Sequence, residues 1–436
     1  MLRRAWVSIR LLTTPIQMKG CDKMNKLYAG IDVHSTINYV YLMKPDGDKH
    51  SSFSTKNSPD GSKKMANNIA SALTSLSLCD ALVGIEATGV YGDNLMFYLR
   101  DESGLSQFDC DFHVLNPKQV KKFKDSYSDL PKNDPVDAFV VADSLRFGRI
   151  TKPMYIDNDY KYKALQTLTR ARFFAVQNLT REKQRFANYL FMKCSGLAQE
   201  KVFSNNTGAT SMALVDEFET VDEIAYMDID ELADFISEKG RNRFANPLAV
   251  AEAVKAAARG SYRLPETIND SVNQALSVSV ASIKAMKQPV KTYDNAIAKQ
   301  LELIPNTLTS INGIGQVYSA GIISEIGNVN RFPNHAALAK YAGLAWKEHK
   351  SGNFEAEITN LVKSGNRYLR YYLLEAADSL RKCDSEFRRY YSLKFKEVNR
   401  FQHKRALALT ARKLVRLVFR LLKDNRLYTP PELFKR

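Results

Sequence analysis

Four acidic residues in the first third of the chain have the side-chain type and spacing that metal-dependent phosphate chemistry needs. Asp32 and Glu86 each end a short apolar run of the kind that forms a strand. Asp134 and Asp137 are three residues apart at the start of a predicted helix, so their side chains share one face. Carboxylates that converge repel one another unless cations lie between them, and Mg²⁺ prefers oxygen ligands and keeps phosphate oxygens as partners. The set therefore predicts a site for metal-assisted phosphoryl transfer.

Each of these acids also has a purely structural interpretation. Asp32 alone is equally compatible with a carboxylate that caps the turn after its strand. His34 stands two residues further on and could touch a metal site, although a turn role is the simpler interpretation. Asp134 and Asp137 could merely cap their helix. The combined order and spacing of the acids, rather than any one of them, favours the metal site.

A serine far downstream is the candidate nucleophile. Ser351 stands between Lys350 and Gly352, two residues after His349. The basic neighbours attract phosphate, and the glycine allows a turn that exposes the hydroxyl. A serine attacks phosphate only when a base or metal activates it in a fixed in-line geometry. His349 is a candidate base, but a histidine near a loop is more often a surface residue, and a loop serine is usually only a turn residue.

Further residues are candidate contacts to nucleic acid. A basic helix is predicted at 118–124, and a Gly-Ile-Gly turn at 313–315 joins two predicted helices in a helix-hairpin-helix pattern. Such a turn presents backbone N–H groups to a DNA phosphate, whereas an ordinary helix–helix turn is the alternative. Ser364 is the second candidate nucleophile, but it more simply binds phosphate with nearby arginines. The candidate contacts are Lys121, Lys122, Gly313, Gly315, Lys350, Arg367 and Arg370.

The elements that position the four acids alternate between strands and helices, which predicts an α/β domain with a central sheet. The first stretch, 27–44, predicts a hairpin with Asp32 near the end of its first strand. Further strands are predicted at 80–86 and 111–116, and helices at 62–76, 92–99, 118–124 and 134–147.

The rest of the chain is predicted to be mostly helical. Two long patterns, 160–194 and 267–303, could pair as an antiparallel coiled coil. Between them, 200–261 carries 12 acidic against 6 basic residues and reads as an inserted subdomain of unknown purpose. A Gly-rich loop at 346–353 precedes further helices. The expected parts are a disordered extension (1–26), a catalytic domain (27–150), a helical arm (158–302) and a second catalytic domain (303–425).

The composition narrows the class of partner. The 436 residues include 63 basic and 47 acidic residues, and from 363 to 436 the count is 20 against 7. This excess favours a polyanion such as nucleic acid, although a solvated helical face is the alternative. No apolar run suggests a membrane span or a signal peptide. Five scattered cysteines argue against a disulfide framework or zinc site and for a reducing cytosol.

Several motifs together resemble one protein family. Tyr28-Ala-Gly-Ile-Asp32-Val-His-Ser, Gly84-Ile-Glu86-Ala-Thr-Gly-Val-Tyr-Gly92 and Lys132-Asn-Asp134-Pro-Val-Asp137-Ala resemble the RuvC-like DEDD domain of insertion-sequence-110 type transposases. Residues 311–327, 332–343, 349–352 and 363–370 resemble the C-terminal transposase domain of the same family. The resemblance covers roughly 27–150 and 303–385 in the family's order.

The resemblance implies a RuvC-like (RNase H-like) domain, a coiled-coil arm and a mostly helical transposase domain. It implies a recombinase that excises and inserts its own mobile element, with Mg²⁺ (or Mn²⁺) held by the four acids and Ser351 as the nucleophile. It also implies a bridge RNA, a structured non-coding guide that pairs with donor and target DNA. Because acids and serine lie in separate domains, we expect a homo-oligomer, dimer or tetramer, in the cytoplasm of a prokaryote at its nucleoid.

Two other interpretations remain open. A Mg²⁺-dependent Holliday-junction resolvase or related nuclease would use the same acids with water as the nucleophile. A non-enzymatic remnant of a mobile element would bind nucleic acid without chemistry, although the presence of all four acids counts against it.

Overall fold

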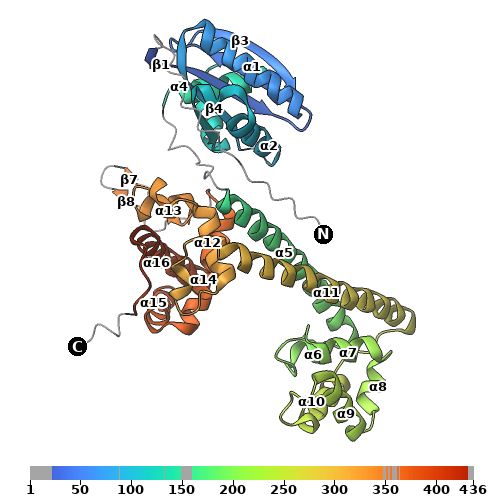
Figure 1. Cartoon of the computed structure of the whole chain (residues 1–436). Helices are drawn as coiled ribbons and strands as arrows, with labels where there is room; N and C mark the ends of the chain where they lie inside the picture. The colour runs from blue at the N-terminus through green and yellow to red at the C-terminus, as the bar shows by residue number, and fades with distance from the viewer. Residues whose placement is uncertain are drawn as a thin grey trace, which may run out of the picture. The chain divides into compact units, whose positions relative to one another are not determined.

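The computed structural model divides into two compact units, Met1–Ile156 and Asp157–Arg436, which are described separately (Figure 1). The described residues are 22–87, 89–131, 133–148, 160–346, 350–351, 354–355, 361–362 and 364–430. Within these ranges, no helix is both long and apolar enough to cross a membrane.

The first unit is built on a five-stranded sheet in the order β3-β2-β1-β4-β5. The strands are β1 (Asp22–Val33), β2 (Ile37–Met43), β3 (Lys49–Lys56), β4 (Leu78–Glu86) and β5 (Asp109–Leu115). The first three form an antiparallel meander, while β4 runs parallel to both β1 and β5. Because Ile31 of β1 is in register with Ile85 of β4, the next residues, Asp32 and Glu86, lie at the carboxyl ends of neighbouring strands, at the same edge of the sheet.

Helices cover both faces of this sheet. The α-helices are α1 (Pro59–Ser75), α2 (Tyr91–Phe97), α3 (Pro117–Lys124) and α4 (Asp134–Arg146). Odd-numbered residues of β1, including Ile31, pack in one core with α1. The opposite face of β1 meets α4 at Gly30, where a Cβ atom would lie 2.1 Å from the carbonyl oxygen of Ala138. This close approach places the first turn of α4 near the end of β1.

Two long helices form the predicted arm of the second unit. α5 (Lys161–Lys193) and α11 (Glu266–Leu301) run antiparallel, joined by an Arg172–Asp294 ion pair and by a 2.6 Å hydrogen bond from Ser279 to Glu182 (Figure 1). Between them lie five short helices, which share one core with the adjoining parts of α5 and α11. These are α6 (Ser195–Gln199), α7 (Ala209–Glu217), α8 (Val221–Tyr226), α9 (Ile229–Gly240) and α10 (Pro247–Arg259).

Five helices surround a third core at the other end of the arm. They are α12 (Gln316–Ile326), α13 (His335–Tyr341), α14 (Arg367–Cys383), α15 (Ser385–Lys396) and α16 (Gln402–Asp424). The fully buried Tyr372 of α14 packs at Gly321 of α12, where a Cβ would lie 2.3 Å from its ring, and its hydroxyl donates to the Thr169 carbonyl of α5 at 2.7 Å. The arm and the C-terminal helices are therefore tied together through α5.

The structure corrects several details. β1 begins at Asp22, within the segment expected to be disordered, and β3 was not predicted. Before the Gly-Ile-Gly turn there is only a short 3₁₀ helix, Leu308–Ser310, instead of an α-helix. The sequence argued against a disulfide framework; Cys79 is nevertheless disulfide-bonded, whereas Cys110, Cys194 and Cys383 are free thiols.

The expected Gly-rich loop at 346–353 includes strand segments. β6 (Ala345–Trp346) pairs antiparallel with β9 (Leu361–Val362), and β7 (Lys350–Ser351) pairs with β8 (Phe354–Glu355). The described residues between β6 and β9 thus form two short antiparallel pairs of strands.

Candidate active site

The four predicted acids lie at one edge of the N-terminal sheet. Asp32 and Glu86 are near or at the ends of β1 and β4, and Asp134 and Asp137 are in the first turn of α4. The N-cap of α4 is Asn133, whose Oδ1 accepts a hydrogen bond from the backbone N–H of Val136 at 3.0 Å. Because Asn133 already caps the helix, capping does not explain the two aspartates.

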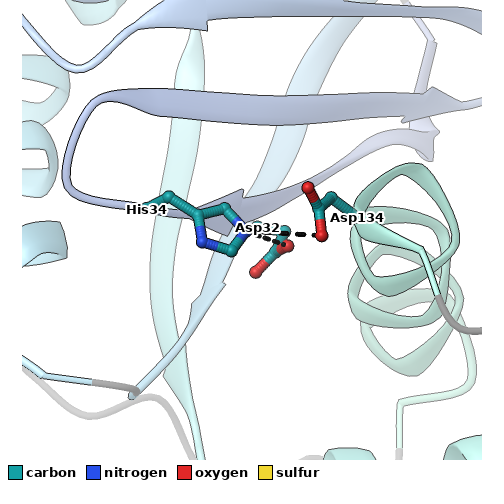
Figure 2. A group of neighbouring side chains, drawn as sticks. All are labelled: Asp32, His34 and Asp134. Carbon is teal, nitrogen blue, oxygen red and sulfur yellow. Dashed lines mark hydrogen bonds and ion pairs between the residues drawn. The ribbon is translucent and has the colours of Figure 1, made fainter.

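Figure 2 shows His34 in contact with both Asp32 and Asp134. His34 Nε2 lies 3.0 Å from Asp32 Oδ2 and 3.6 Å from Asp134 Oδ1. One ligand-capable atom from each of these side chains lies within 4.8 Å of the other two. The simpler interpretation of His34 as a turn residue therefore omitted its contacts to both acids.

The acids also interact through their charges. Burial raises the pKa of Asp32, the neighbouring His34 opposes this rise, and the charges of Asp137 and Asp134 add to it. Burial likewise raises the pKa of Glu86, with further contributions from Asp32 and Asp137 and an opposing one from Lys124. All four acids thus share one electrostatic environment, in which a bound cation would offset both desolvation and repulsion.

The donor set fits a divalent cation. Carboxylate oxygens suit Mg²⁺ and Mn²⁺, and an imidazole nitrogen suits transition metals. Within the described residues, Asp137 has a competing cationic partner, because Lys124 Nζ lies 2.6 Å from its Oδ1. The basic helix α3 therefore supplies one lysine to the acidic cluster, besides any contact it makes with nucleic acid.

Two groups of predicted nucleic-acid contacts lie on the surface. Lys121 and Lys122 are exposed on α3. Gly315 stands at the N-cap of α12 with open space where a Cβ would point. Gly313 instead adopts φ +98° and packs against Cys383, so the conformation of the turn itself requires a glycine at this position.

Ser351 lies on β7 and is paired with Phe354 of β8. The candidate base His349 lies outside the described residues. The acids belong to the unit Met1–Ile156 and the serine to the unit Asp157–Arg436. The structure therefore describes the two halves of the predicted site separately.

The segment after β9 contains the remaining candidates. Arg367 is exposed, with its guanidinium 4.7 Å from the ring centre of Tyr368. Arg370 is half-buried beside Gly343, and burial lowers the pKa of its guanidinium. Ser364 is half-buried. These surroundings suit Arg367 for phosphate contact better than Arg370.

Sequence reasoning missed a buried acid in the second unit. The side chain of Glu325 on α12 is fully buried and accepts two hydrogen bonds from Arg170 of α5, at 2.7 and 2.9 Å. Asn366, the N-cap of α14, donates to the same carboxylate at 2.6 Å, and Gln166 donates at 3.2 Å. The available signal was one acid within the otherwise apolar helical run 320–326.

Comparisons with known proteins agree across both units. Residues 29–192 match a family model described as a transposase with a DEDD domain of the IS110 type. Residues 306–392 match a model described as transposase, IS116/IS110/IS902 family. Together the two matches cover more than half of the 436 residues.

Two bacterial relatives are similar in sequence. The chain is 24% identical over 321 residues to an uncharacterized 44.8 kDa protein of insertion element IS116 from Streptomyces clavuligerus, covering 72% of this chain and 76% of the relative. It is 28% identical over 159 residues to an uncharacterized 43.6 kDa protein of insertion element IS110 from Streptomyces coelicolor, covering 36% and 38%.

Proposed function

The chain belongs to the IS110 family of transposases, and we propose that it excises and inserts a mobile DNA element under the guidance of a structured bridge RNA. Its substrates are DNA, and its reaction is the cleavage and rejoining of DNA strands. The observation that carries the proposed chemistry is the convergence of Asp32, Glu86, Asp134 and Asp137 on one edge of a mixed five-stranded sheet. The same strand order supports the RNase H-like fold that the family resemblance implies.

In this proposal the four acids hold Mg²⁺ or Mn²⁺. When bound, such an ion neutralises developing charge on the phosphate and favours the ionised form of an attacking hydroxyl. The chain's own contribution is to hold four carboxylates at fixed positions on β1, β4 and α4. Lys124 balances part of their charge through its ion pair with Asp137.

Ser351 is the proposed nucleophile. Its hydroxyl oxygen forms a bond to the phosphorus as a phosphorus–oxygen bond of the DNA breaks. The serine loses one proton and the departing DNA oxygen gains one, so the exchange is balanced. The resulting serine–DNA ester conserves the energy of the phosphodiester, which suits rejoining to a second DNA end without ATP. The basic neighbour Lys350 and the glycine that follows Ser351 in the sequence support this role.

The basic C-terminal region is the proposed surface for the RNA. Residues 363–436 carry 20 basic and 7 acidic residues, and aromatic rings lie among them. The Arg381 guanidinium lies 4.8 Å from the ring centre of Tyr391, and Lys413 Nζ lies 4.9 Å from that of Tyr390. Such surfaces bind phosphates and stack bases. We further propose an oligomer that joins two DNA duplexes at the nucleoid, in the cytoplasm of a prokaryote.

The nuclease alternative, with water as the nucleophile, is not favoured, because the similarity to transposases extends to both units. Hydrolytic nicks in place of joined products would restore it. Sequencing of RNA that co-purifies with the protein tests the guide. A structured non-coding RNA encoded beside the element is expected, and purified protein that recombines DNA without any RNA would contradict the guided mechanism.

A matched pair of variants tests the metal-dependent function. Asp134 and Asp60 are both acids in the first turn of a helix, but only Asp134 belongs to the acidic cluster. Asp134→Asn should lower the rate of DNA strand cleavage by at least about 100-fold, whereas Asp60→Asn should cleave normally. Both should retain wild-type circular dichroism. Cleavage by Asp134→Asn at the wild-type rate would overturn the assignment.

A further inference from the structure

We propose that His34 is a direct ligand of the divalent cation, through Nε2, and that it makes the site prefer Mn²⁺ to Mg²⁺. This inference rests on the proposed function, which places a cation among the four acids. It adds to the four carboxylates a nitrogen donor for which sequence reasoning preferred a turn role, and so assigns a metal preference to this chain.

The distances between donor atoms support this role (Figure 2). Neighbouring ligands of an octahedral ion with bonds of about 2.1 Å are about 3.0 Å apart, and opposite ligands are about 4.2 Å apart. His34 Nε2 lies 3.0 Å from Asp32 Oδ2 and 3.6 Å from Asp134 Oδ1. The three side chains can therefore donate to one ion with only small rotations.

The backbone around His34 is held firmly although its side chain is half-exposed. The N–H of His34 donates to the Ile37 carbonyl at 3.0 Å, which closes the turn between β1 and β2. The side-chain amide of Asn57, beyond β3, donates to the His34 carbonyl at 2.8 Å and to the Tyr91 carbonyl at 3.3 Å. The imidazole also meets the ring of Tyr39 edge-on, with centroids 6.2 Å apart. These contacts fix the direction in which the imidazole leaves the turn.

Ligand chemistry gives the metal preference. Mg²⁺ binds oxygen donors and holds its waters tightly, whereas imidazole nitrogen is a better donor for transition metals. One imidazole beside several carboxylates should therefore add more to the binding of Mn²⁺ than to that of Mg²⁺. The competing role for His34 is a hydrogen bond that orients Asp32 without a bond to the metal.

Pulsed electron paramagnetic resonance of the full-length protein with Mn²⁺ distinguishes the two roles. The wild type should show the ¹⁴N coupling of a coordinated imidazole. His34→Asn should lose that coupling and bind Mn²⁺ at least about tenfold more weakly, with a smaller change for Mg²⁺ in competition titrations. His50→Asn is the control. His50 lies near the start of β3, whereas the end of β3 pairs with Ile37 near His34, so this replacement should leave the binding of both metals unchanged.

The outcomes separate this inference from the proposed function. Wild type that binds Mn²⁺ at the acids without any ¹⁴N coupling overturns the role of His34 and leaves the acids as ligands. Coupling that persists in His34→Asn also overturns it. If Asp32→Asn binds Mn²⁺ as tightly as the wild type, the proposed metal site fails together with this inference. The wild-type spectrum is decisive even where the variant folds poorly.

Discussion

Asp32 and Glu86 show at the scale of single residues how the proposed catalytic cluster opposes the stability of its own fold. Burial disfavours the charged form of each carboxylate, and neighbouring acids disfavour it further, so both pKa values are raised. A cation that binds here competes with the retained protons, so its affinity increases with pH until both acids are ionised. In the proposed metal site, a bound cation would relieve the electrostatic cost that the metal-free protein bears.

The raised pKa of Glu86 gives a pH dependence of defined sign. An acid whose pKa is higher in the folded state stabilises the fold below its unfolded pKa, and this contribution is lost as pH rises through the folded value. The ordinary value for this carboxyl is 4.5. Metal-free Glu86→Gln should therefore melt at a higher temperature than the wild type near pH 7, and the difference should shrink toward pH 4. Thermal melts from pH 4 to 8 measure it, and a wild-type advantage that grows with pH would contradict it.

The acids could be predicted because each follows a local rule, ending a strand run or opening a helix. His34 and Glu325 could not be assigned in this way. The position of His34 depends on Asn57, which follows a strand, β3, that the sequence pattern did not reveal. Glu325 depends on Arg170, 155 residues away along the chain. Pairings of this kind arise from tertiary packing and leave no periodic signal.

At the scale of elements, Glu325 joins three helices. Its carboxylate on α12 binds Arg170 of α5 and Asn366 at the start of α14. The strand β9 ends shortly before Asn366, so this contact also anchors the chain that leaves the strand pairs around Ser351. A fully buried carboxylate needs such partners, because an unpaired buried charge is strongly destabilising.

Removal of Arg170 should reveal the energetic cost of leaving the buried charge of Glu325 unpaired. Arg170→Leu should destabilise the second unit by about 3 kcal/mol, and Glu325→Gln in the same chain should restore part of the loss, because the orphaned charge is removed. Arg172→Leu is the matched control two residues along α5; its partner Asp294 is partly exposed, so its loss should cost less than about 1 kcal/mol. Calorimetric melts compare the variants. Equal costs for the two arginines would contradict this account of the pair.

The exposed lysines of α3 make a separate prediction at the same scale. Lys121 and Lys122 project into solvent beside the acidic cluster. If each contacts one phosphate, Lys121→Gln/Lys122→Gln should reduce the slope of log affinity for DNA against log salt concentration by about 2. Lys63→Gln/Lys64→Gln is the control, because these lysines are equally exposed on α1, on the other face of the sheet. An unchanged slope in the α3 variant would contradict the proposed phosphate contacts of Lys121 and Lys122.

The element types were largely predictable where runs are long. The strong helical periodicity of α5 and α11 predicted the two helices of the arm. The apolar runs of β1, β4 and β5 predicted the three strands that form the parallel part of the sheet. The strands around Ser351 were not predicted, because each pairs only two residues and the glycine there indicates a loop. The short 3₁₀ helix before Gly313 was mistaken for an α-helix because the Gly-Ile-Gly turn after it is typical of a helix-hairpin-helix.

At the scale of the whole molecule, the proposed chemistry is divided between two units. The acids lie on the sheet of the first unit, and Ser351 lies between α13 and α14 of the second. Neither unit holds both the carboxylates and the serine, so the proposed reaction requires them to come together, within one chain or between protomers. The net charge of +16 favours binding to nucleic acid.

In the proposed reaction Ser351 and the four acids act on the same phosphate, and covalent trapping on labelled DNA tests this most directly. Wild type and Ser364→Ala, supplied with Mg²⁺ and the co-purified RNA, should both yield a labelled protein–DNA adduct that survives denaturation. Ser351→Ala and Asp32→Asn should yield none, although both should still bind the RNA. An adduct of normal yield in Ser351→Ala, or one in Asp32→Asn equal to that of the wild type, would contradict the claim.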